Sequence, residues 1–140
     1  MAVTISGTDG ISGDLSTIKV SNGTQAAPAL TGQDTDSGVF FGTNEVNIST
    51  NGSTRATVDS SGRVGIGTNS PSDANSNADD LVISATGSGA GITIFSDTDN
   101  FGNIYFGDGS SAAHRGRVRY DHSNDALTLS TSAQERMRIT

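Results

Sequence analysis

Turn-forming residues interrupt this chain about every four to eight positions, where Gly, Asn, Asp or Ser recurs along most of its length. Segments this short are marginal as helices but match the usual length of β-strands. We therefore expect an all-β fold of short strands and hairpins. The expected strands are residues 3–6, 17–21, 39–42, 45–50, 54–58, 63–67, 81–84, 92–96, 103–107, 117–120 and 126–129.

The best local turn signal is Asn51-Gly52, between residues 45–50 and 54–58. Both central residues of a type I′ hairpin turn need a positive φ, which Asn and Gly adopt readily. A further turn is expected at residues 59–62, and residues 117–120 are expected to pair with 126–129. Residues 132–138 are the one window compatible with a helix, but the internal repeat described below favours a turn and a strand there.

The chain has too few large apolar residues to make an ordinary core by itself. Leu, Ile, Val and Phe occupy 28 of its 140 positions, a proportion that borders on that of disordered proteins. Disorder is disfavoured because Pro, Glu, Lys and Gln are scarce and because the apolar residues fall in short clusters. The alternative is a fold whose core is shared with other chains.

Charge and residue types exclude several classes of function. A net charge of −7 disfavours nucleic-acid binding through a general electrostatic field, and the chain has no cysteine for disulfides or thiolate chemistry. Residues 1–7 lack the basic and apolar regions of a signal peptide, and no apolar run is long enough to span a bilayer. We expect assembly in a cytoplasm and no membrane insertion.

The chain also contains an internal similarity at an offset of 81 residues. Residues 48–58 read Ile-Ser-Thr-Asn-Gly-Ser-Thr-Arg-Ala-Thr-Val, and residues 129–139 read Leu-Ser-Thr-Ser-Ala-Gln-Glu-Arg-Met-Arg-Ile. Upstream, residues 39–42 resemble residues 104–107, with about sixteen additional residues in the second copy. The pattern predicts two repeated β modules. The second copy stops at Thr140, in the middle of a turn, as expected of a chain that continues or of the proximal part of a longer one.

Residues 60–71 read Ser-Ser-Gly-Arg-Val-Gly-Ile-Gly-Thr-Asn-Ser-Pro, which resembles a signature of the fibre and spike proteins of tailed bacteriophages. Residues 3–13 and 135–140 resemble other parts of such fibres. The resemblance covers about half of the chain and is specific for architecture, since it is also found in surface adhesins. It implies an elongated, intertwined β-fibre of three identical chains, attached to the virion by its N-terminal part and contacting a host receptor through a distal part. Gly65 and Gly67 would let three backbones approach one axis.

These considerations predict a virion-attachment segment at residues 1–36, a first β module at 37–73 and a second at 74–140. The residues expected to attach the chain to phage tail or capsid proteins are Val3, Ile5, Ile11, Leu15, Ile18 and Val20. Those expected in a trimer core are Val46, Ile48, Val58, Val64, Ile66, Leu129 and Ile139.

No catalytic, cofactor or metal site is expected. Glycan cleavage needs paired carboxylates across a groove, whereas Glu45 and Glu135 are expected at a strand start and in a turn. His114 and His122, the only histidines, are interpreted as exposed loop residues. Residues 97–108 and 34–38 look superficially like calcium loops, but turn formation is favoured for both.

Arg115, Arg117 and Arg119 alternate and should share one face of a strand. Contact with a polyanion is one interpretation, and a solvated face or salt bridges to a neighbouring chain is the favoured one. The function expected is that of a structural virion protein, the proximal part of a trimeric tail fibre. The alternatives are a capsid-surface fibre or decoration protein and, less favoured, a fragment of a glycan-degrading spike.

Overall fold

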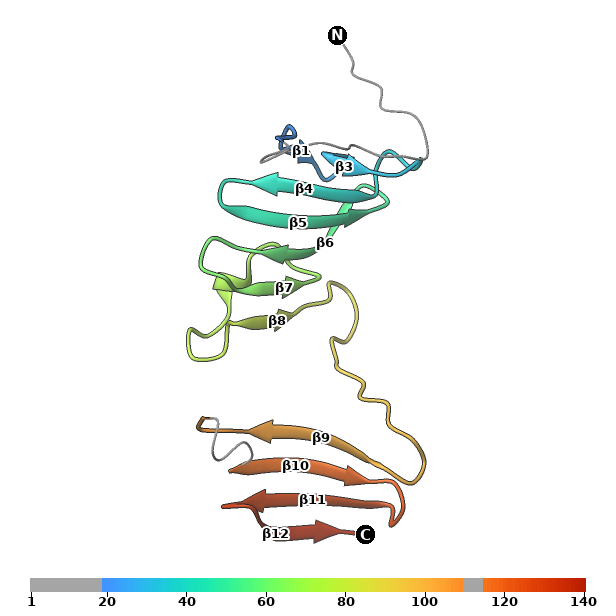
Figure 1. Ribbon diagram of the computed structural model, residues 1–140, viewed down its shortest axis with the longest axis vertical. Coiled ribbons are helices and arrows are strands. Elements are labelled where there is room, and N and C mark those ends of the chain that lie inside the picture. The colour runs from blue at the N-terminus through green and yellow to red at the C-terminus, as the bar shows by residue number, and fades with distance from the viewer. Residues whose placement is uncertain (1–18, 110–114) are drawn as a thin grey trace, which may run out of the picture. The chain divides into compact units, whose positions relative to one another are not determined.

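The computed structural model describes residues 19–109 and 115–140, and the described chain is all-β apart from one 3₁₀ turn, Pro71–Asp73 (Figure 1). It divides into two compact units, the first ending at Ala90 and the second beginning at Gly91. The expected strand at residues 3–6 lies outside the described residues, as do the expected attachment residues Val3, Ile5, Ile11, Leu15 and Ile18.

The first unit contains a six-stranded sheet in which the strands follow each other in sequence order (Figure 1). All neighbours are antiparallel except the last two, which run parallel. A separate two-stranded ribbon, β1 (Gly23–Thr24) and β2 (Ala27–Pro28), precedes this sheet. The six strands are β3 (Leu30–Thr31), β4 (Gly38–Gly42), β5 (Glu45–Thr50), β6 (Ser53–Val58), β7 (Val64–Ile66) and β8 (Leu81–Ile83).

The second unit contains a four-stranded antiparallel meander, again in sequence order (Figure 1). The expected pairing of residues 117–120 with 126–129 is confirmed, and residues 132–138 form the expected turn and strand. The strands are β9 (Phe101–Phe106), β10 (Gly116–Asp121), β11 (Ala126–Thr131) and β12 (Gln134–Ile139).

The hairpins β5–β6 and β11–β12 match residue for residue at an offset of 81. Ile48 is opposite Ala56 and Leu129 is opposite Met137, and each hairpin has a register shift at the next position. Both turns place two residues at positive φ, Asn51-Gly52 at 51° and 63° and Ser132-Ala133 at 51° and 59°. These are the φ values that a type I′ turn requires.

The register corrects one part of the sequence alignment. Residues 39–42 were aligned with residues 104–107, which lie in β9. In the structure, Val39 of β4 is opposite Ile48, as Val118 of β10 is opposite Leu129. The equivalent of β4 is therefore β10, and the additional residues of the second copy include β10 itself, because the aromatic strand β9 is one strand further from the hairpin.

Two expectations about the middle of the chain are also corrected. Residues 81–84 were expected to form the first strand of the second module, but β8 pairs in parallel with β7 and so belongs to the first sheet. Residues 92–96 were expected to form a strand but have no regular secondary structure, because no neighbouring strand pairs with them.

The N-terminal part of the described chain also departs from expectation. Residues 19–21 are not in a strand, and Val20, expected to attach the chain to the virion, is 42% exposed. Residues 23–31 contain three two-residue strands that the sequence pattern did not predict, and β3 pairs with β4. Part of the segment expected to serve only for attachment is thus an element of the first sheet.

Candidate functional site

One face of the six-stranded sheet is lined by apolar side chains from edge to edge. Side chains alternate between the faces of a strand, and residues directly opposite each other in neighbouring strands share a face. The register therefore aligns two rows across the sheet. They are Leu30, Val39, Ile48, Ala56, Ile66 and Ile83 in one row, and Phe41, Val46, Val58, Val64 and Leu81 in the other.

The four-stranded sheet of the second unit has an apolar face of the same kind. One row contains Ile104, Val118, Leu129 and Met137, and the next contains Gly102, Tyr120, Leu127 and Ile139. Phe106 lies at the end of this face, opposite Gly116. Within each unit, the apolar residues from both strands of the matched hairpin lie on the apolar face of that unit's sheet.

These faces are not covered within the described chain. Nineteen large apolar side chains of the described residues are exposed, thirteen of them on these two faces, and apart from prolines Ala126 is the only aliphatic or aromatic side chain buried among the described residues. Val46 and Ile48 are exposed by 46% and 48%, and Leu129 and Ile139 by 38% and 50%. Contiguous apolar surface of this extent is characteristic of an interaction site.

The positions buried on the opposite faces are occupied by small polar groups. In the first unit, Asn47, Ser49 and Thr57 are buried, and the Thr57 hydroxyl donates to Asn47 Oδ1 at 2.7 Å. In the second unit, Thr128 and Ser130 are buried. Each unit is thus inverted relative to an ordinary domain, because its buried side chains are mostly small and polar whereas its large apolar side chains are exposed.

The structure brings together the residues that the sequence predicted for a trimer core, within each unit. Val46, Ile48, Val58, Val64 and Ile66 share the apolar face of the first sheet. Leu129 and Ile139 share that of the second. Their burial between copies stays a prediction.

Other residues of the two faces were missed because assigning them requires the register. They are Leu30, Val39, Phe41, Ala56, Leu81 and Ile83 in the first unit, and Ile104, Phe106, Val118, Tyr120, Leu127 and Met137 in the second. Propagating the alternation outward from the Asn51-Gly52 turn could have found some of them.

The fibre-like motif at residues 60–71 is built around Arg63. Arg63 Nε lies 2.7 Å from Asp59 Oδ2, and its Nη1 lies 3.1 Å from Asp79 Oδ2. Asp59 Oδ1 also accepts the backbone N–H groups of Ser61 and Arg63. Partial burial acts to raise the pKa of Asp59, but these hydrogen bonds and the Arg63 charge outweigh it and lower the pKa below its usual value.

The glycines of this motif allow close approaches within the chain, and their expected place at a trimer axis stays a prediction. A Cβ added at Gly65 would lie 2.5 Å from the Thr68 carbonyl oxygen, and one at Gly67 would lie 2.1 Å from that of Ser84. Gly65 is opposite Thr57, on the polar face. Within the described chain, these glycines allow close approach of the chain to itself, and they do not line the apolar face.

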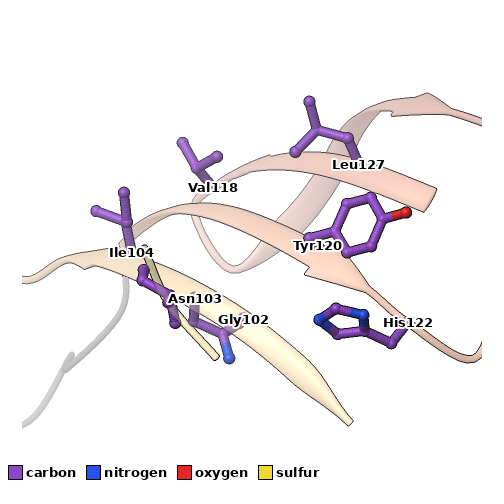
Figure 2. Close-up of a pocket in the computed structure, with 8 residues that line it drawn as sticks. Gly102, Asn103, Ile104, Val118, Tyr120, His122 and Leu127 are labelled. Atoms are coloured by element: carbon purple, nitrogen blue, oxygen red, sulfur yellow. The ribbon is translucent and has the colours of Figure 1, made fainter. Parts of the chain in front are cut away.

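A pocket of about 230 Å³ opens on the apolar face of the second unit (Figure 2). It forms where Gly102 leaves a gap beside Tyr120, whose ring meets His122 edge-on with centroids 4.9 Å apart. Ile94, Asn103, Ile104, Val118 and Leu127 complete its lining. This lining suits an apolar side chain and provides no pair of carboxylates for hydrolysis.

The remaining chemical candidates form local structure. Glu135 forms an ion pair with Arg138 at 2.8 Å, and Glu45 begins β5. The Asp97 carboxylate accepts the Thr98 N–H, and the Asp97 carbonyl accepts the Asn100 N–H, which makes this segment a turn. No group of three or more potential metal ligands is present in the described residues. His114 lies outside them.

Comparison with family models, with curated proteins and with solved structures gives no match for this chain. Within residues 19–109 and 115–140, no helix has the length and hydropathy that crossing a membrane requires. The open apolar faces are therefore the observations on which a functional interpretation depends.

Proposed function

We propose that this chain is a structural segment of a homotrimeric bacteriophage fibre, whose two apolar sheet faces are buried against the equivalent faces of two further copies. The observation that carries this proposal is the inverted burial, in which both sheets cover small polar groups and expose their apolar rows. Identical copies provide matching apolar surface for every row, and a cyclic arrangement leaves no copy uncovered.

The number of copies comes from the fibre resemblance and fits the dimensions of the faces. Most strands contribute only two large side chains to the apolar face. Three sheets, one from each copy, can pack such narrow apolar rows against each other around one axis. In this arrangement, Val46, Ile48, Val58, Val64, Ile66, Leu129 and Ile139 form layers of the trimer core.

The function proposed for this rod is mechanical. Residues 1–36 attach it to the tail, and the β units hold a distal receptor-binding region away from the virion, where three copies raise avidity. No catalytic step is part of the proposal. A capsid-surface fibre would need the same rod and is the alternative.

Labelling of virus particles tests the proposal. Antibodies against this chain should decorate projections of the tail in electron micrographs of the virus whose genome encodes it. Decoration of the capsid would favour the capsid-surface alternative, and unlabelled particles would contradict both. Release of oligosaccharides from host polysaccharide by the purified chain would instead support a glycan-degrading spike.

A further inference from the structure

Phe95 is the most exposed large apolar side chain of the described residues. It is 93% exposed, whereas the other exposed large apolar side chains lie between 37% and 68%. An aromatic ring in water is stabilised by any partner that covers it, and aromatic residues are enriched in the cores of protein interfaces. The described part of the chain provides no such cover, so a partner for this ring has to come from outside it.

The segment around Phe95 lies over the apolar face of its own sheet. A Cβ added at Gly102, on that face, would lie 3.7 Å from Ile94 Cγ2 and 3.9 Å from Ser96 Oγ. The side chains on both sides of Phe95 are thus directed at the sheet. Successive side chains of an extended segment point in opposite directions, so Phe95 projects away from the sheet, on the side where other copies are proposed to pack.

The pocket on the same apolar face can hold a phenyl ring (Figure 2). Its volume is about 230 Å³, and a cavity of about 150 Å³ lined by aliphatic and aromatic side chains is enough to bind benzene. Ile104, Val118 and Leu127 provide aliphatic walls. The Tyr120 ring adds an aromatic surface against which a second ring can pack edge-on or offset.

The ring of the same chain does not fill this pocket. Ile94 already forms part of the pocket wall, and Phe95, the next residue, points the other way. For Phe95 to enter, the segment would have to turn over and withdraw Ile94 from the face. A ring from another copy meets no such obstacle, because it approaches from the open side.

We infer that Phe95 of one copy inserts into the pocket beside Tyr120 of the next copy. The inference rests on the proposed trimer and names a contact that holds its second units together. Ring and pocket are different surfaces of one unit, so the contact is heterologous, and a cyclic arrangement of copies closes it. Each copy then donates one ring and accepts one, and neither surface stays open.

Photochemical cross-linking of the full chain tests this inference. A phenylalanine that carries a diazirine group replaces Phe95, and the sample is irradiated at a concentration at which the wild type is assembled. We expect a product with the mass of more than one chain, in which position 95 is joined to peptides that contain Ile104, Val118 or Leu127. The same photoreactive residue at Phe101, on the opposite face of the sheet, is the matched control and should give no such cross-link.

Two substitutions test the contact from its two sides. Phe95→Ala should raise the concentration at which half of the trimer dissociates by at least about tenfold, because it removes a buried aromatic anchor. The circular dichroism of the assembled variant should match that of the wild type, since the ring is exposed in the single chain. Gly102→Leu fills the pocket, where a Cβ meets no atom closer than 3.7 Å, and should abolish the cross-link from position 95.

The outcomes separate this contact from the trimer itself. Cross-links confined to one chain, cross-links to another surface, or an unchanged dissociation concentration in Phe95→Ala would overturn the inference and leave the trimer intact. An apolar small molecule retained in the assembled wild type and displaced by Gly102→Leu, detected by native mass spectrometry, would also exclude Phe95 as the occupant. A wild-type chain that stays single at every concentration would contradict the proposed trimer, and this contact with it.

Discussion

At the scale of single residues, the fold depends on small buried side chains on the face opposite the apolar rows and, in the first unit, on glycines where the chain approaches itself. Ser49 and Thr57 are 1% exposed and Thr128 is fully buried. These residues satisfy their hydroxyl groups locally, as in the hydrogen bond from Thr57 to Asn47. Because these buried positions hold small polar residues in place of large apolar ones, the composition of the chain lies near the border of disorder.

A first prediction concerns the turn at Ser132-Ala133. Ala133 has a φ of 59°, a left-handed conformation that strains a residue with a Cβ, whereas the matched hairpin has Gly52 at that position. We expect Ala133→Gly to raise the free energy of unfolding by about 0.5–1 kcal/mol, measured by chemical denaturation. Gly52→Ala should lower it by a similar amount, since an added Cβ would meet only Asp36 Oδ2 at 3.8 Å. A decrease in the free energy of unfolding for Ala133→Gly, or an increase for Gly52→Ala, would show that the two turns are not of the same type.

A second prediction concerns acid. The pKa of Asp59 is lowered in the folded chain, so its contribution to stability is complete above the unfolded value of about 3.9 and is lost as the pH falls through the folded value. The pKa of Asp121 is lowered as well, and the largest cause is its side-chain hydrogen bond with Asn124. Stability should therefore decrease on acidification below about pH 4.

Asp59→Asn is the variant that isolates this contribution, because it keeps the shape of the side chain but cannot titrate. Denaturation curves recorded over the acid range should show a lower stability at neutral pH and a shallower decrease with acid than in the wild type. An acid dependence identical to that of the wild type would contradict the importance of the Asp59–Arg63 pair.

At the scale of elements, the sequence predicted the parts of the fold that local signals determine. The strand at 45–50, its turn and the following strand were predicted because the I′ turn and the alternation agree. The two-residue strands β1 to β3 carry no periodic signal, and the membership of β8 depends on a parallel pairing across a connection that contains the 3₁₀ turn. The segment 92–96 has the pattern of a strand but no partner within the described chain, and pattern alone cannot provide one.

The apolar faces were predictable only in part for the same reason. Val46, Ile48 and Val58 flank the Asn51-Gly52 turn, so alternation alone places them on one side. Leu30 and Leu81 join the same face only through the register of edge strands. The alternation of arginines in the second unit predicted that they share one face of a strand. The contact of Arg119 with the Phe101 ring could be found only in the structure.

A third prediction tests the faces as elements. Ile48 is 48% exposed in the single chain, and a substitution at such an exposed site usually changes stability by no more than about 0.5 kcal/mol. If the face is buried between copies, Ile48→Asp places a charge in an apolar interface and should dissociate the assembly. Size-exclusion chromatography with light scattering measures this effect. Ser60→Asp, in the exposed turn that follows the neighbouring strand, is the control and should remain assembled.

At the scale of the whole molecule, the two units share one design. Each is a sheet of short strands in sequence order that buries small polar side chains and exposes an apolar face, and each matched hairpin places its apolar residues on the apolar face of its own unit. A design of this kind is incomplete as a single chain, because exposed apolar rows on this scale favour association. Assembly and folding are therefore expected to be coupled.

The most direct test of this coupling is the mass of the purified wild-type chain in dilute solution, measured by analytical ultracentrifugation together with its circular dichroism. We predict a β-rich species with three times the 14.2 kDa mass of the chain, which loses its structure when it dissociates. A stable, folded species with the mass of one chain would contradict the proposal that the apolar faces are buried between copies.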